Sequence, residues 1–154
     1  PSSAASDVYK RQQELFSILQ NTAEKRPDVK LHILSNGQHF HDEDMETLQS
    51  INNDLHVLWG IPLYSFNEKN HDEIVGKQGA FKKVMENLFK IGSAGTAIEL
   101  RTVLTKKNAL DLPELANFVQ SIQEIQKAGS ILTNPCILPK QLKPWGLNML
   151  FLLR

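Results

Sequence analysis

A chain of 154 residues is long enough to bury a hydrophobic core, either as one domain or as a piece of a larger barrel. Its 17 basic and 17 acidic side chains give a formal net charge of zero, so nothing in the charge suggests a nucleic-acid partner. The apolar runs stop well short of the roughly 20 residues that cross a bilayer, and no signal peptide opens the chain. We therefore expect a cytoplasmic protein with no membrane partner. The single cysteine, Cys136, excludes an internal disulfide framework and a multi-cysteine metal site.

The first twelve residues are unusual for a protein. The segment PSSAASDVYKRQ resembles, from Ser2 to Gln12, the translated end of a transposon adapter used to prepare sequencing libraries. We interpret residues 1–12 as an artefact and expect them to be disordered, because small polar residues offer no apolar face. The alternative is a genuine polar lead-in to the helix that follows. On the artefact interpretation the chain is a fragment, and the sequence upstream of Gln13 has been lost.

From Gln13 onward, strand and helix patterns alternate. The expected strands are VKLHIL at 29–34, LHVLWGIPLYS at 55–65 and AIELRTVLT at 97–105. Pro27 ends the first helix, and Asp44 can cap the second. The apolar stripes of the expected helices are Leu15, Ile18, Leu19 and Ala23; Met45, Leu48 and Ile51; Phe81, Val84, Met85, Leu88 and Phe89; and Leu115, Phe118, Val119, Ile122 and Ile125.

This alternation predicts an α/β fold with parallel strands, either a barrel or an open doubly wound sheet. The carboxyl ends of parallel strands share one face, where ligands bind to the loops that follow. Three loops should therefore converge: SNGQHFHDED at 35–44, YSFNEKNHDEIVG at 64–76 and TKKNALD at 105–111.

Four segments carry a family resemblance. In order, LHILSNGQHF, IPLYS, HDEIVGKQGAF and ELRTVLTKKNALDLPELANFV resemble the radical S-adenosylmethionine (radical SAM) enzymes, most closely the radical SAM maturases of the His-Xaa-Ser peptide-modification system. The match covers about residues 13–120. It implies that residues 13–128 form a partial β/α barrel truncated on its N-terminal side. It also implies a ribosomally made peptide as substrate and a second maturase as partner.

The same resemblance implies two cofactors for the parent enzyme, S-adenosylmethionine and a 4Fe-4S cluster. In that family three cysteines at Cys-x3-Cys-x2-Cys spacing hold the cluster, and a Gly-Gly-Glu motif follows a later strand. Both are absent here and would lie upstream of Gln13. This chain alone is therefore expected to be inactive, and no catalytic residue is assigned.

S-adenosylmethionine needs hydroxyl or amide hydrogen-bond partners and a cation that can fork onto its carboxylate. By resemblance, Ser35 and Asn36 would lie near the cofactor, Ser65 would reach its polar portion and Arg101 would face the carboxylate. Purely structural roles remain open for each. Asn36-Gly37 is a turn signal, Ser65 can cap its loop, and Arg101 can pair with a neighbouring carboxylate on the inner face of a barrel. Asn108 is interpreted as a turn residue.

The histidines support one competing interpretation. A rim site formed by His39, His41, Asp42, His71 and Asp72 would bind zinc or manganese and indicate a metal-dependent hydrolase. We favour a solvated loop and helix cap for residues 39–44, and His71-Asp72 would then fix loop geometry. The third alternative is a non-catalytic α/β fragment.

Residues 129–154 depart from the family pattern. The parent would continue into another strand, whereas this tail is interrupted by Pro135, Pro139 and Pro144. We interpret it as a divergent or frameshifted segment and assign no functional residue there. Cys136 is read as an ordinary thiol, because one cysteine cannot hold a cluster.

Overall fold

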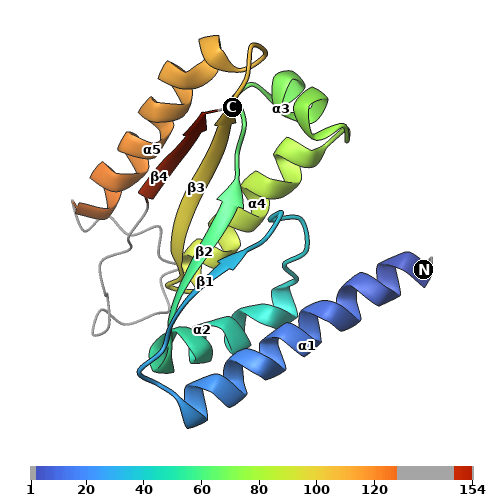
Figure 1. Cartoon of the computed structure of the whole chain (residues 1–154), viewed down its shortest axis with the longest axis vertical. Coiled ribbons are helices and arrows are strands. Elements are labelled where there is room, and N and C mark those ends of the chain that lie inside the picture. Colours follow the sequence, from blue (N-terminus) through green and yellow to red (C-terminus); the bar gives the residue numbers. More distant parts are fainter. Residues whose placement is uncertain (1–2, 128–147, 154) are drawn as a thin grey trace.

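The computed structural model of the chain describes residues 3–127 and 148–153 (Figure 1). Strands and helices alternate along most of it. The elements are α1 (Ser3–Lys25), β1 (Lys30–Leu34), α2 (Met45–Asp54), β2 (His56–Pro62), α3 (Glu68–Val75), α4 (Ala80–Ser93), β3 (Ala97–Leu104), α5 (Leu112–Lys127) and β4 (Asn148–Leu153), with short 3-10 turns at Asp42–Asp44 and Ala109–Asp111.

The strands form one parallel sheet in the order β1-β2-β3-β4, so neighbours in the sequence are neighbours in space. Leu34 lies opposite Gly60 in the first pair, and Gly60 lies opposite Glu99 in the second. All strands run in the same direction, which brings their carboxyl ends to one edge (Figure 1). The predicted α/β class with parallel strands is confirmed.

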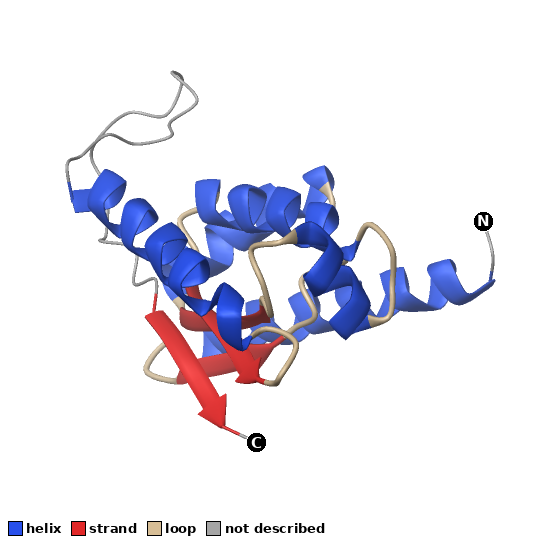
Figure 2. Ribbon diagram, turned by 90° about the horizontal axis from the view of Figure 1, so that it is seen from above, coloured by secondary structure: helices blue, strands red, loops and turns tan. Residues whose placement is uncertain are grey.

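The two faces of the sheet differ because successive side chains of a strand point to opposite sides. One face carries Val57, Trp59, Ile61, Ile98 and Leu100, all buried in the hydrophobic core. Figure 2 shows the helices gathered on one side of the sheet. They contribute the remaining core residues, including Phe16, Leu19, Leu48, Ile51, Val84, Leu88, Ile91, Leu115 and Val119.

The opposite face of the sheet carries no helix in the described part of the chain (Figure 2). Leu34 on this bare face is 63% exposed. His32, Glu99 and Arg101 alternate with the core residues of β1 and β3 and occupy the same face. Among the described residues, no helix is long and apolar enough to cross a bilayer.

Several expectations about the elements need correction. Residues 3–12 were expected to be disordered, but they belong to α1, and Gln12 makes a tertiary hydrogen bond to Asp44. The loop expected at 64–76 contains α3, which Asn67 caps at its start and Gly76 ends in a left-handed conformation. Ile18 and Phe89, placed on apolar stripes, are 61% and 51% exposed, whereas the unpredicted Phe16 is buried.

The tail also differs from the expectation. Residues 148–153, inside the segment interpreted as divergent or frameshifted, form β4 and pair with β3 from Glu99 to Leu104. The sheet therefore continues beyond residue 128. Cys136 and the three tail prolines lie outside the described residues.

Candidate functional site at the carboxyl ends of the strands

A hollow lies where β1, β2 and β3 end, on the bare side of the sheet. Its cavity volume is about 370 Å³. The residues that line it are Leu34, Ser35, Asn36, Gly60, Pro62, Tyr64, Arg101 and Val103. The structure thus brings together Ser35, Asn36 and Arg101, three of the four residues predicted for a cofactor site.

The polar loop after β1 is a turn and also a wall of this hollow. The Ser35 hydroxyl accepts a hydrogen bond from the Gly37 amide at 3.2 Å, and the Asn36 side chain accepts one from the Gln38 amide at 3.0 Å. Gly37 has a φ of 69°. A Cβ there would lie 2.8 Å from side-chain carbons of Ile61 and of Val84, so only glycine fits. The predicted turn at Asn36-Gly37 is therefore confirmed.

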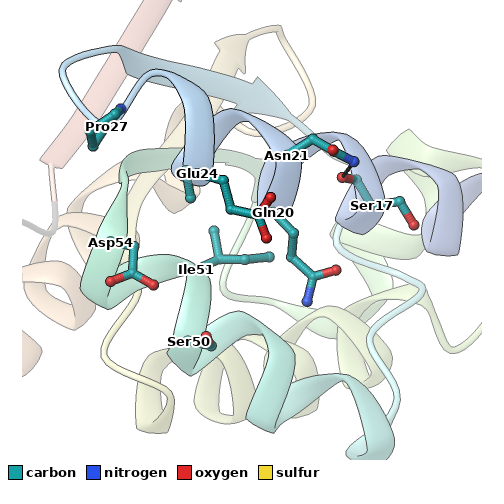
Figure 3. A pocket seen from close by; sticks show the side chains of 9 residues that line it. Ser17, Gln20, Asn21, Glu24, Pro27, Ser50, Ile51 and Asp54 are labelled. Atoms are coloured by element: carbon teal, nitrogen blue, oxygen red, sulfur yellow. Dashed lines mark hydrogen bonds between the residues drawn. The ribbon is translucent and has the colours of Figure 1, made fainter.

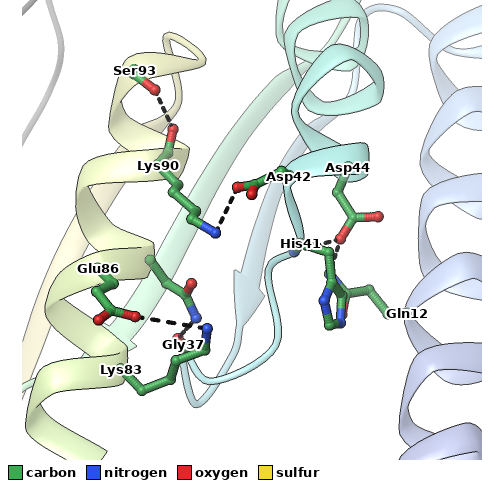
Figure 4. A network of polar contacts seen from close by, with 10 residues as sticks. Gln12, Gly37, His41, Asp42, Asp44, Lys83, Glu86, Lys90 and Ser93 are labelled. Atoms are coloured by element: carbon green, nitrogen blue, oxygen red, sulfur yellow. Dashed lines mark hydrogen bonds and ion pairs between the residues drawn. The ribbon is translucent and has the colours of Figure 1, made fainter.

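Helix α4 packs beside this loop and is joined to it by polar contacts (Figure 4). The buried Asn87 donates a hydrogen bond to the Gly37 carbonyl at 2.7 Å, and Gln38 donates one to the Ala80 carbonyl at 3.1 Å. Further along, Lys90 pairs with Asp42 at 2.6 Å. The backbone of the loop is consequently fixed relative to the sheet.

Ser65 does not reach the hollow. Its side chain is fully buried, donates a hydrogen bond to Asp111 at 2.6 Å and accepts one from the Asn67 amide at 2.9 Å. Hydrogen bonds from Ser65 and then Asn70 lower the pKa of Asp111. Ser65 therefore joins the loop after β2 to the turn after β3, and the structure favours the alternative in which it caps its loop.

Asn108 has the structural role expected for it. Its side-chain oxygen accepts hydrogen bonds from the Thr105 amide and hydroxyl, at 2.7 and 2.9 Å. Its amide nitrogen donates to the carbonyls of Tyr64 and Val103, at 2.8 and 3.0 Å. Asn108 is fully buried and fixes the backbone of two residues that line the hollow. The turn interpretation is confirmed.

Arg101 lies beside a carboxylate, as one of the alternatives anticipated. The Arg101 Nε is 3.3 Å from Glu99 Oε1, and the same oxygen is 3.4 Å from His32 Nε2. Arg101 Nε and Glu99 Oε1 are both buried, and neither makes a hydrogen bond with the described residues, so their contact is an ion pair. Arg101 therefore pairs with Glu99 and also lines the hollow.

Gly60 makes room for this cluster. A Cβ at Gly60 would meet Leu34 at 2.7 Å, His32 Nε2 at 3.0 Å and Arg101 Cδ at 3.1 Å. The side chains of β1 and β3 thus lean over the backbone of β2. The pairing of Arg101 with a neighbouring carboxylate was one of the expected alternatives, and Glu99 is that carboxylate. Sequence reasoning missed His32 and Gly60, although two-residue alternation from Leu34 would have placed His32 on the same face.

The residues of the metal-site alternative have other partners. His71 is 1% exposed, its Nδ1 accepts a hydrogen bond from the Tyr64 amide at 3.3 Å, and burial lowers its pKa. Asp72 accepts hydrogen bonds from the amides of Gly79 and Phe81 at the start of α4, and the bond from Phe81 is the main reason its pKa is lowered. Asp42 pairs with Lys90. Within residues 3–127 and 148–153, no group of three or more His, Cys, Asp or Glu side chains could hold a metal ion.

A larger hollow of about 540 Å³ lies between α1 and α2 and contains none of the predicted site residues (Figure 3). Its lining residues are Ser17, Gln20, Asn21, Ala23, Glu24, Pro27, Ser50, Ile51 and Asp54. All of its charged and polar lining side chains are exposed, and the one buried residue, Ile51, belongs to the hydrophobic core. This surface has the properties of a solvated groove between two helices.

The fold is that of an α/β protein, and the hollow at the strand ends is a candidate binding site. No protein-family model matches the chain, and no curated protein matches it significantly. Among solved structures, the chain is similar to the crystal structure of SuiB from Streptococcus suis, with a TM-score of 0.56 and 15% sequence identity. The match covers 88% of this chain and 35% of the SuiB chain. At this identity the likeness shows the fold alone, and the chain spans about a third of the length of that neighbour.

Proposed function

We propose that this chain is part of a radical SAM peptide-modifying maturase of the His-Xaa-Ser system type, and that it supplies consecutive β-α units of a partial barrel. The observation that carries the proposal is the hollow at the strand ends, where Ser35, Asn36 and Arg101 meet. The family resemblance assigns these three residues to the cofactor. A ribosomally made peptide and a partner maturase remain part of the proposal.

The strand order supports a barrel rather than a doubly wound sheet. A doubly wound sheet reverses its strand order and carries helices on both faces. Here the order is sequential, and the helices lie on one side (Figure 2). In a β/α barrel the helices form the outer ring, and the opposite face of the sheet lines the interior. On this proposal His32, Glu99 and Arg101 point into the barrel.

The lining of the hollow suits S-adenosylmethionine. Arg101 offers a planar cation for a carboxylate, Asn36 and Ser35 offer polar groups, and Tyr64 adds an aromatic hydroxyl. Behind the lining, Arg101 Nε and Glu99 Oε1 are buried without a hydrogen bond to the described residues and face each other as an ion pair. When bound, this cofactor supplies the radical chemistry, while the protein orients it and limits access of water.

The residues present do not suit the iron-sulfur cluster. Such a cluster needs several cysteine thiolates, and the chain contains one cysteine. We therefore derive no step through a cluster. The cluster ligands belong, on this proposal, to the parent enzyme upstream of Gln13, and recovering three cysteines at the family spacing in the genomic sequence there would support the assignment.

Replacement of Arg101 in that parent tests the cofactor role. A charge-assisted hydrogen bond contributes about 1.5 to 3 kcal/mol, so Arg101→Ala should weaken S-adenosylmethionine binding roughly ten- to a hundredfold. Arg101→Lys should restore only part of this loss, because lysine lacks the planar fork. Equilibrium binding to the cluster-loaded parent is the measurement, with circular dichroism to check folding. Arg26→Ala is the control, since Arg26 is exposed and pairs with Asp28. Unchanged affinity in a folded Arg101→Ala protein would reject the cofactor role.

A further inference from the structure

Three polar side chains, from β1 and β3, meet above β2, the strand between them, on the bare face. Glu99 Oε1 lies between Arg101 Nε at 3.3 Å and His32 Nε2 at 3.4 Å. The side chains of Glu99 and Arg101 are 13% and 24% exposed. A carboxylate at this depth needs partners. It has an ion-pair contact on each side, and its Oε1 makes no hydrogen bond with the described residues.

The contact between Glu99 and Arg101 uses the inner end of the guanidinium. Glu99 and Arg101 are two residues apart on β3 and share a face, so the carboxylate meets Nε rather than the terminal nitrogens. Among the described residues, the ion pair of Arg101 is made through Nε. A guanidinium has five donors in a planar fork, and engaging Nε leaves the outer edge for a second acceptor.

Arg101 is also the one charged residue among those that line the hollow, whose other members are apolar or neutral. An acceptor that approaches through the hollow would therefore meet a single positive charge beside the neutral polar groups of Ser35 and Asn36. A planar carboxylate matches the guanidinium fork with two parallel hydrogen bonds.

We propose that Glu99 is a positioning residue that holds Arg101 by Nε, so that the outer edge of the guanidinium is presented to a ligand carboxylate in the hollow. His32 restrains Glu99 from the other side. This inference rests on the proposed function for the identity of the ligand, S-adenosylmethionine, and extends it to a residue that does not line the hollow.

The test uses the whole isotope-labelled chain in solution, with nuclear magnetic resonance of the arginine Nε–H group and of the Ser35 and Asn36 amides. The Arg101 signal is assigned by its loss in Arg101→Lys. Two probes are titrated, S-adenosylmethionine and methylthioadenosine, which lacks the amino-acid carboxylate. Glu99→Gln keeps the shape of the side chain and removes its charge. Glu86→Gln is the matched control, because Glu86 lies on α4 and pairs with Lys83 at 3.9 Å.

Glu99→Gln should weaken S-adenosylmethionine binding about tenfold and leave methylthioadenosine binding unchanged, while Glu86→Gln behaves as wild type. In an Arg101→Ala background, Glu99→Gln should have no further effect, because the residue acts through Arg101. Equal weakening of both probes would show a merely structural role and overturn the proposal, as would an unchanged affinity for S-adenosylmethionine.

Failure of the proposed function gives a different result. If S-adenosylmethionine shifts none of these signals in the wild-type chain, the cofactor assignment fails, and acetate becomes the probe of Arg101. A shift of the Arg101 signal by acetate that is reduced in Glu99→Gln would still support the positioning role. The same response in both proteins, or none in either, would overturn it.

Discussion

At the scale of single residues, the hollow depends on side chains behind its walls as well as on those that line it. His71 is buried against the rings of Phe81 and Tyr64, with centroid separations of 5.7 and 5.9 Å. Its Nδ1 accepts the hydrogen bond of the Tyr64 amide, which requires that nitrogen to be unprotonated. Because Tyr64 lines the hollow, neutral His71 helps to fix one wall of the site.

This arrangement predicts a loss of stability in acid. Burial lowers the pKa of His71 below its ordinary value of 6.5, and the nearby Asp72 opposes the shift only in part. Below that value the unfolded chain binds a proton that the folded chain does not, so the free energy of unfolding falls as the pH falls. We expect the thermal midpoint to decrease between about pH 7 and pH 5 and the decrease to be shallower in His71→Asn.

The slope of thermal midpoint against pH is the quantity to compare, because His71→Asn also changes the stability at neutral pH. His56→Asn serves as the control, since His56 is exposed at the start of β2. It should keep the wild-type slope. Equal slopes in wild type and His71→Asn would show that His71 does not govern the acid sensitivity.

Sequence reasoning gave His71 and Asp72 two alternative roles, a shared metal-binding rim and the fixing of loop geometry, and their hydrogen bonds are those of the second role. A sequence shows that an imidazole and a carboxylate are adjacent, whereas their directions depend on the helix that carries them. Asp72 turns toward the start of α4, and His71 turns into the core. Arg101 was better predicted, because alternation along a strand specifies the face on which a side chain lies.

At the scale of elements, periodicity predicted β1, β2, β3 and the longer helices but not β4. The expected strand at 97–105 differs by one residue from β3, and the stripe from Phe81 to Leu88 lies on α4. Helix α3 was missed because its sequence, EKNHDEIV, is too polar to show an apolar stripe. The cap at Asn67 and the glycine at Gly76 were the signals that could have revealed it.

Asp44 shows a different limit of prediction at this scale. It stands at the start of α2 as expected, but its side chain does not cap that helix. The carboxylate instead accepts hydrogen bonds from Gln12 and the His41 amide, both at 2.9 Å (Figure 4). It also accepts one from Gln13 at 3.1 Å. Two of these partners are more than 30 residues away, so no local pattern could indicate them.

We expect Asp44→Ala to destabilise the chain by about 1 to 3 kcal/mol, because three part-buried hydrogen bonds to the buried Asp44 are lost. Deleting residues 1–11 should change the free energy of unfolding little, since Gln12 and Gln13 remain to bind Asp44. Urea denaturation measures both quantities. A loss in the deletion as large as that in Asp44→Ala would mean that residues 1–11 are an integral part of the fold.

At the scale of the whole molecule, the sheet has a hydrophobic side that the helices cover and a bare side that holds the candidate site. Leu34 is exposed there beside a carboxylate and an arginine that are both largely buried. A barrel would enclose such a face, and its remaining strands would come from outside this chain on the proposed function. On that function the site is divided between this chain and the rest of the parent enzyme, and this division has a chemical consequence.

That consequence concerns iron. On the proposed function the chain holds a cofactor pocket but not the thiolates that bind a 4Fe-4S cluster, and a cluster held by cysteine needs more ligands than one. We predict that the isolated chain, reconstituted anaerobically with iron and sulfide, will hold no stoichiometric cluster. Iron and sulfide content per chain, measured on the monomeric fraction, is the readout. Cys136→Ser is the control and should retain the same trace of iron as wild type, because bound iron would be adventitious in both. A full cluster per chain that is lost in Cys136→Ser would contradict the proposal that cluster binding belongs to the upstream part of the parent enzyme.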